Sequence, residues 1–263
     1  TMPDQISSGS VDLTLYNSPT VSTNVAPTAW SNRWSTLYDG TDDGFASASA
    51  VTFANSAYTV SMWVKPASFP SSGDGPTLFV IGPTGGSSYN VHRTQVYLNG
   101  NQGKIRVREG DGANRSSKNS TTSLSLNTWH HVCAASAGDG STDSYKVYVD
   151  GSEAFSFTGR AVSGGPYTWK FHVGFHDMAT PRLFFDGNIT EVTCWDRQLS
   201  STEVSNLYNS GNPTDPMDTT GVTSDAVAYY RMGDRWNKGT VPDQIGSVDL
   251  TMTSAPVPEE DVP

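Results

Sequence analysis

Short runs in which apolar and polar residues alternate recur along this chain. Residues 58–64, with the sequence YTVSMWV, alternate with a period of two, which is the period of a β-strand. Residues 129–136, 170–174 and 189–195 are further apolar runs of strand length. The pattern predicts a protein built mainly from short strands.

Two pairs of these runs are joined by residues that favour tight turns. Residues 94–98 and 104–109 flank Asn99-Gly100, and residues 145–149 and 153–158 flank Asp150-Gly151. Asn-Gly and Asp-Gly tolerate the left-handed backbone that two-residue hairpins need. Both pairs are therefore predicted to form antiparallel hairpins.

One segment near residues 201–209 has the signals of a short helix. Ser200 and Glu203 have the spacing of a capping box. The apolar face that follows is formed by Val204, Leu207 and Tyr208. Gly211 is expected to end the helix, and Pro213 prevents its continuation. Many strands with one short helix predict an all-β fold, an antiparallel two-sheet jelly-roll sandwich.

Composition agrees with this fold class and excludes two kinds of partner. The 263 residues include 25 Gly and 15 Pro, and only 16% are charged, which suits one large sandwich or two small domains. The net charge of −10 is opposite to that of a protein that neutralises nucleic-acid phosphates. Since no stretch of eighteen apolar residues occurs, we expect no membrane span.

Cysteine usage and the start of the chain bear on where the protein works. Cys133 and Cys194 lie in apolar, strand-like segments and are too few for a disulfide scaffold; whether they are bridged stays open. The chain starts with Thr1-Met2-Pro3 and has no apolar leader. Either a leader has been removed or an initiator methionine has been clipped, and we favour the second. The expected location is a virion or the extracellular space.

A repeated segment is the most unusual feature of the sequence. Residues 3–6 and 9–14 read PDQI and GSVDLT, and residues 242–245 and 246–251 repeat them with ten identical positions. The first copy differs by the insertion of Ser7-Ser8. The copies are too far apart for a solenoid, so we interpret them as one structural segment that occurs at both ends of a domain-sized unit.

Seven short motifs lie between these copies, at residues 37–43, 58–66, 129–132, 146–151, 185–192, 195–200 and 203–211. In sequence and in order, they resemble laminin-G-like and pentraxin-like domains of the concanavalin A-like lectin/glucanase group. The resemblance implies a concanavalin A-like sandwich. It is specific for the fold and not for the function, because the fold carries lectins, adhesion modules, glycanases and structural proteins. The end of the chain, residues 229–234 followed by the second repeat copy, is similar to the ends of laminin-G-like proteins from phages and other viruses.

The resemblance divides the chain into three parts. Residues 1–36 hold the first copy and a lead-in, residues 37–211 form the sandwich body, and residues 212–263 hold a strand, the second copy and an acidic tail. Residues 229–234 look like the first strand of such a domain, although they follow the body. The chain is therefore either a circularly shifted unit or one unit with the start of another.

The resemblance also implies a Ca²⁺ site near Asp-Gly turns, because many relatives bind this ion. The candidate ligands are Asp39, Asp42, Asp43, Asp186 and Asp234. Members of the family usually have an acid where this chain has Thr190, so this chain lacks one ligand or supporting group at that position. Ordinary turns that favour Asp are the alternative.

Two further groups of residues are candidates for ligand contact. Lys104, Arg106 and Arg108 alternate with apolar residues and share one face of a strand, with Arg93 nearby in sequence. They could bind an anionic partner such as an acidic glycan, or form a solvated outer face. Aromatic residues in loop-like segments could stack on sugar rings. These are Trp30, Trp34, Tyr89, Tyr167 and Trp169.

Catalytic motifs such as a nucleophile elbow, a zinc-protease helix or a P-loop are missing from the sequence, so we expect no enzyme. Our first hypothesis is a structural virion protein, a capsid decoration or tail-appendage subunit. In it one repeat copy completes the sandwich and the other docks on a neighbouring copy or another surface protein. The alternative is a glycan-binding lectin or adhesin module that uses calcium.

Overall fold

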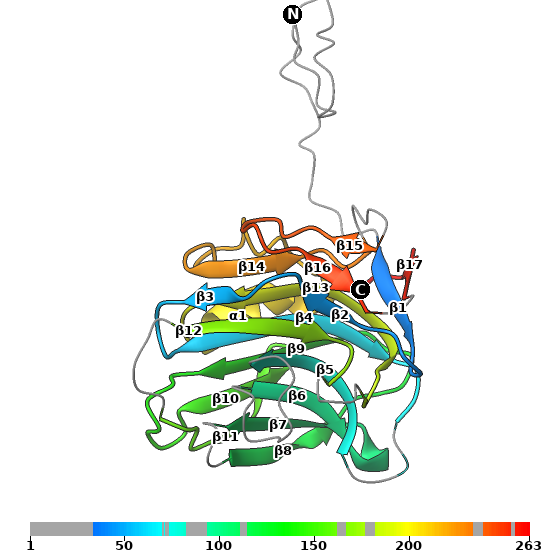
Figure 1. Ribbon diagram of the computed structural model, residues 1–263. Coiled ribbons are helices and arrows are strands. Elements are labelled where there is room, and N and C mark those ends of the chain that lie inside the picture. The colour runs from blue at the N-terminus through cyan, green and yellow to red at the C-terminus, as the bar shows by residue number, and fades with distance from the viewer. Residues whose placement is uncertain are drawn as a thin grey trace, which may run out of the picture. The chain divides into compact units, whose positions relative to one another are not determined.

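The computed structural model describes residues 34–69, 71, 74–82, 94–110, 115–161, 167–176, 182–233, 239–253 and 256–263. All of these belong to one compact unit formed by residues 32–263. Two antiparallel sheets make up this unit, and they are layered face to face (Figure 1). The predicted two-sheet sandwich is confirmed.

The first sheet is continuous from the β11 hairpin to the C-terminal tail. Its spatial order is β11 (Ser152–Phe157), β10 (Tyr145–Val149), β9 (His130–Ser136), β4 (Tyr58–Pro66), β13 (Asp186–Trp195), β1 (Ser35–Asp39) and β17 (Val257–Glu259). β14 (Ala226–Tyr230) also pairs with β13. It continues the edge that β1 begins, because β1 pairs with residues 186–189 and β14 with residues 192–195.

The second sheet contains the other strands of the described chain. Its spatial order is β15 (Thr240–Val241), β16 (Leu250–Met252), β2 (Phe45–Ser47), β12 (Tyr167–Val173), β5 (Asp74–Gly82), β6 (Thr94–Asn99), β7 (Lys104–Gly110) and β8 (Arg115–Ser123). β3 (Val51–Phe53) pairs with the start of β12. A short 3₁₀ turn, η1 (Gly100–Gln102), joins β6 to β7.

Alternation of side chains along the strands forms the core between the sheets. Val60, Met62 and Val64 of β4 belong to the same buried cluster as Ile105 and Val107 of the second sheet. β4 is buried on its other face as well, because α1 (Ser201–Tyr208) and the residues before it cover the first sheet. The period-two pattern of residues 58–64 therefore separates two buried environments rather than core from solvent.

The predicted helix and its cap are confirmed. The Ser200 hydroxyl accepts a hydrogen bond from the Glu203 amide at 3.3 Å, and the Glu203 carboxylate accepts one from the Ser200 amide at 2.7 Å. The regular helix ends at Tyr208, where Asn209 adopts the left-handed conformation. The turn η2 (Asn209–Gly211) follows, so Asn209 ends the helix before the predicted stop at Gly211.

Both predicted hairpins form, and their turns differ. Asp150 and Gly151 have φ angles of 50° and 73° and make a two-residue turn between β10 and β11, as this dipeptide favours. Asn99 instead ends β6, and the connection to β7 needs the extra turn η1 with Gly103 in the left-handed region.

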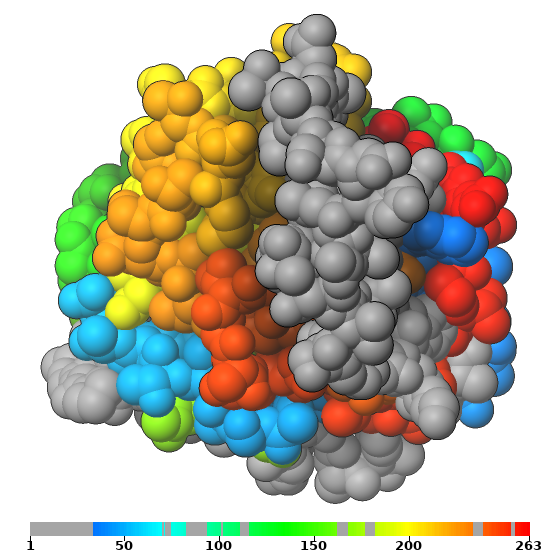
Figure 2. All heavy atoms as spheres, turned by 90° about the horizontal axis from the view of Figure 1, so that it is seen from above, coloured from blue at the N-terminus to red at the C-terminus, as the bar shows by residue number. Residues whose placement is uncertain are grey.

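The second copy of the repeat adds to the second sheet of the same chain's sandwich. β15 and β16 lie at its two ends, and β16 pairs with β2. In Figure 2 the orange-red atoms of this segment lie beside the light-blue atoms of the segment that holds β2 and β3. The first copy lies outside the described residues.

The two cysteines are free and cannot bridge each other as placed. Cys194 belongs to the core between the sheets, whereas Cys133 lies under α1 on the other face of the first sheet. Within the described chain, α1 and the 3₁₀ turns fall well short of the length needed to cross a membrane.

Candidate functional site

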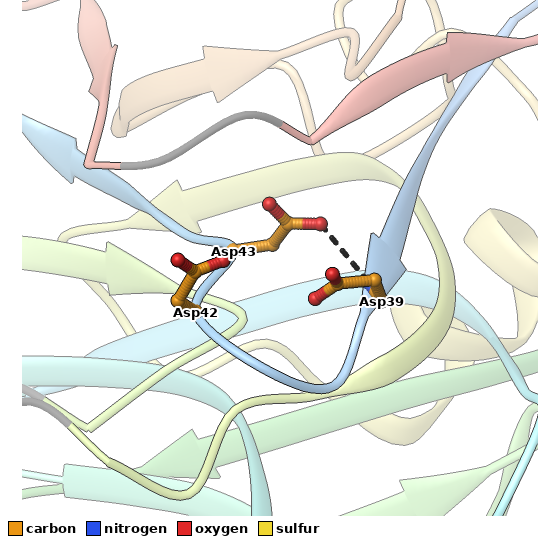
Figure 3. A group of neighbouring side chains, drawn as sticks. All are labelled: Asp39, Asp42 and Asp43. Carbon is orange, nitrogen blue, oxygen red and sulfur yellow. Dashed lines mark hydrogen bonds between the residues drawn. The ribbon is translucent and has the colours of Figure 1, made fainter.

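Three acidic side chains meet at the turn between β1 and β2. Asp39 ends β1, and Asp42 and Asp43 follow within the turn. Gly40 has a φ of 75° and lies against Asp186, where a Cβ atom would approach the Asp186 Cβ to 2.9 Å. This glycine allows the chain to reverse direction tightly and brings the three carboxylates together (Figure 3).

Hydrogen bonds within the turn fix the orientation of two of these carboxylates. The Asp39 amide donates to Asp43 Oδ2 at 3.0 Å, and the Thr41 amide donates to Asp39 Oδ1 at 2.8 Å (Figure 3 draws the first). Asp43 is 5% exposed, whereas Asp39 and Asp42 are exposed. Burial, with a further contribution from the Asp43 charge, holds the pKa of the Tyr38 phenol well above its ordinary value.

The donor set fits a hard divalent cation. Oxygens bound to one Ca²⁺ at the usual distances of 2.3–2.6 Å lie at most about 5.2 Å apart. One carboxylate oxygen from each of Asp39, Asp42 and Asp43 lies within 4.8 Å of the others. Calcium prefers oxygen ligands of this kind, so these residues could hold it with little rearrangement.

The other residues that were predicted to bind or support Ca²⁺ do not belong to this group of three. Asp186 is the register partner of Asp39 on β13 and lies beside the group of three rather than in it. Asp234 lies outside the described residues. Thr190 is fully buried, and its hydroxyl donates to the Trp34 carbonyl at 3.1 Å. This hydrogen bond connects β13 to the residue that precedes β1.

Lys104, Arg106 and Arg108 form a basic stripe along β7. The stripe lies on the face of β7 that points away from the first sheet. Lys104 and Arg106 are half-buried, and the Arg106 guanidinium lies 5.9 Å from the Tyr97 ring centre. Arg108 is only 3% exposed, so the solvated-face alternative fails at that position. Arg93 lies outside the described residues. The contact with an anionic partner stays a prediction.

A buried polar network that the sequence did not reveal supports this face. Arg108 Nη1 donates to Gln95 Oε1 at 3.2 Å, and Gln95 Nε2 donates to Thr77 Oγ1 at 3.0 Å. The Arg108 guanidinium also lies 5.1 Å from the Tyr97 ring centre. The alternation of Gln95 and Tyr97 with the core residues of β6 is the signal that could have placed them on the outer face.

The aromatic candidates do not form one group in the described chain. Trp169 lies in β12 and packs against Phe53 with ring centres 5.8 Å apart. Tyr167 starts the same strand, so the placement of both in loops is wrong; the pairing of β12 with β3 extends the strand over them. Trp34 is half-buried before β1. Trp30 and Tyr89 lie outside the described residues.

A sandwich with this topology and an acidic turn defines a class of protein with lectin-like architecture. Residues 39–205 match the Laminin_G_3 family model, described as the concanavalin A-like lectin/glucanases superfamily. The match covers more than half of the 263 residues, and the chain belongs to this superfamily.

Two solved structures are similar in fold. A putative carbohydrate binding protein from Bacteroides ovatus has a TM-score of 0.62 at 15% identity, over 89% of this chain and 62% of that one. A heptameric SAP-like pentraxin from Limulus polyphemus has a TM-score of 0.55 at 16% identity, over 76% of this chain and 92% of that one. The chain thus spans less than two thirds of the Bacteroides protein.

A search of curated proteins finds no match. The description of the matching family names lectins, which favours the lectin-like alternative; the virion role stays a prediction.

Proposed function

We propose that the protein is a non-catalytic, carbohydrate-binding module that uses a divalent cation, with calcium as the first candidate. The observation that carries the proposal is the group of Asp39, Asp42 and Asp43 at one turn of a lectin-like sandwich. The carbohydrate-binding description of the Bacteroides relative supports the same class of ligand. Such a module would work outside the cell or on a virion surface.

Exposure of the turn suggests how the ion would take part in binding. Asp39 and Asp42 are exposed, so a cation held there would face solvent on one side. Calcium takes six to eight oxygen ligands, and three carboxylates leave positions for hydroxyl oxygens of a glycan. Lys104 and Arg106 are half-buried on β7, four strands from β2 in the second sheet, so a contact between them and an acidic sugar would be separate from the cation turn.

Calcium binding is tested by titration calorimetry on the full chain and on Asp42→Asn. The substitution removes one charged ligand and leaves the Asp39–Asp43 hydrogen bond in place, so we expect calcium affinity to fall by roughly tenfold or more. Glu153→Gln is the matched control, because it removes an exposed charge from β11. Equal affinity in Asp42→Asn and the control would contradict the proposed ligand set.

Glycan binding is tested on an array of neutral, uronic and sulfated glycans with calcium or with a chelator. We expect binding that the chelator and Asp42→Asn both reduce. Arrays that stay blank in both conditions would remove the carbohydrate-binding proposal. Binding that survives the chelator would remove the role of the cation alone.

A further inference from the structure

The second copy of the repeat closes one edge of the second sheet. Val241 and Leu250 are fully buried and belong to the core between the sheets. β16 pairs with β2, and the Ala48 amide donates to the Asp249 carbonyl at 2.8 Å just beyond this pairing. We call residues 240–252 the closing segment and the edge of β2 its slot.

Specific side chains of the closing segment hold its bend against β14. Asp243 Oδ1 accepts from the Tyr229 amide at 3.0 Å, and Asp249 Oδ1 accepts from the Asp243 amide at 3.0 Å. The Tyr230 hydroxyl donates to the Val248 carbonyl at 2.8 Å. Gly246 lies close against this side chain, because a Cβ atom there would lie 2.3 Å from Asp243 Oδ2 and would force it to shift.

Residues 1–15 carry each of these anchors in the same order. Asp4, Gly9, Asp12 and Leu13 correspond to Asp243, Gly246, Asp249 and Leu250. The flanks correspond as well, with Thr1, Met2 and Leu15 in place of Thr240, Val241 and Met252. The inserted Ser7-Ser8 falls between the positions of Ile245 and Gly246, at a surface bend where Ile245 is 37% exposed.

We propose that residues 1–15 are a second closing segment, which binds the slot of another copy of this sandwich in place of that copy's residues 240–252. One chain carries two closing segments, and the described unit presents one slot for them. The slot is filled from within its own chain at high effective concentration. The first segment is therefore the one left to a second molecule.

The contacts in such an exchange are those that the described closing segment already makes. Main-chain pairing with β2 would supply affinity, and the buried site that Leu250 occupies and the hydrogen bonds of the bend would supply specificity. Because closure by a second chain repeats the same contacts, it competes with self-closure only at high protein concentration or when residues 240–252 are weakened. Repeated exchange links chains head to tail.

The fit of residues 1–15 is tested without any association. In the full chain, residues 240–252 are replaced by the sequence of residues 1–15. If the copy fits the slot, Tm stays within about 2 °C of the unchanged chain. Leu250→Ala is the comparison, because it leaves a cavity under the segment and should lower Tm by roughly 5 °C or more. A transplant that loses as much Tm as Leu250→Ala overturns the proposal.

Binding between molecules is tested by disulfide trapping. β16 pairs Thr251 with Ala46, so Thr14 should meet Ala46 after exchange. A full-length donor with Thr14→Cys and a tag is mixed with a full-length acceptor carrying Ala46→Cys and Leu250→Ala. We expect the donor–acceptor dimer to form at least ten times faster than with a Ser10→Cys donor, which is out of register.

Two controls keep the trapping experiment decisive. Ala46→Cys with Thr251→Cys in one chain must form an internal disulfide, because cross-strand Cα distances suit this bond. If circular dichroism shows that the Leu250→Ala acceptor is unfolded, Asp249→Asn replaces it as the milder weakening. Equal trapping of the two donors, with the internal disulfide formed, overturns the proposal.

Discussion

At the scale of single residues, the His131 imidazole is buried under the outer face of the first sheet. Its ring packs against Trp63 and Tyr208, with ring centres 5.3 and 6.2 Å away, and its Nε2 is 2.7 Å from Ser61 Oγ. Burial lowers its pKa from 6.5 to about 4, and the Asp150 charge opposes this only in part. The folded protein therefore holds a neutral imidazole at neutral pH.

This pKa shift predicts a loss of stability in acid. Between about pH 6.5 and pH 4 the unfolded chain binds a proton at His131 that the folded chain excludes, so the free energy of unfolding falls as pH decreases through this window. The contribution is at most about 3 kcal/mol. Urea unfolding at about pH 7 and pH 4.5 should show a smaller pH-dependent loss for His131→Asn than for the unchanged chain. The same loss in both would contradict this assignment.

At the scale of elements, the short helix α1 covers part of the outer face of the first sheet. Val204 and Leu207 pack with Trp195 and Cys133 on the outer face of the first sheet. The segment before the helix also holds β4, because the Leu199 amide donates to Thr59 Oγ1 at 2.9 Å. The cap at Ser200 therefore stabilises both the helix and the cover over the sheet.

Loss of this cap should destabilise the fold by a measurable amount. Ser200→Ala removes the acceptor for the Glu203 amide, and we expect the free energy of unfolding to fall by about 1 kcal/mol. Ser200→Gly should cost only a few tenths of a kcal/mol. Ser201→Ala, one residue later and exposed, is the control. Denaturant unfolding measures all three, and equal effects of Ser200→Ala and Ser201→Ala would exclude the cap as the cause.

Features that depend on neighbouring residues were predictable from the sequence. The capping box and the Asp150-Gly151 hairpin each arise within a few residues. Of the five acids that the family resemblance implied as ligands, Asp39, Asp42 and Asp43 lie together and Asp186 lies beside them. The burial of Arg108 was not predictable, because it depends on Gln95 and Tyr97 from the neighbouring strand. The strand position of Trp169 likewise depends on its pairing with distant β3.

At the scale of the whole molecule, both cysteines report on opening of the sandwich. Cys133 and Cys194 are buried on opposite faces of the first sheet, and burial raises the pKa of both thiols. Since the thiolate is the reactive form, neither should react with a thiol reagent in the native protein.

We expect both thiols to become reactive together, at the rate of global unfolding. Mass spectrometry after timed labelling checks this, with the urea-unfolded chain as the control for full reaction. Rapid labelling of one cysteine without denaturant would indicate local opening on that face.

The order of strands has a consequence for biosynthesis. β1 and β2 are made early, yet their partners β17 and β16 follow about two hundred residues later in the chain. In the described fold, the edge of β2 is taken by β16 and that of β1 by β17, so these two pairings cannot form before translation has passed residues 252 and 259. Such late, non-local pairing makes folding slow and leaves a period in which nascent chains on one polysome can pair with each other instead of with themselves.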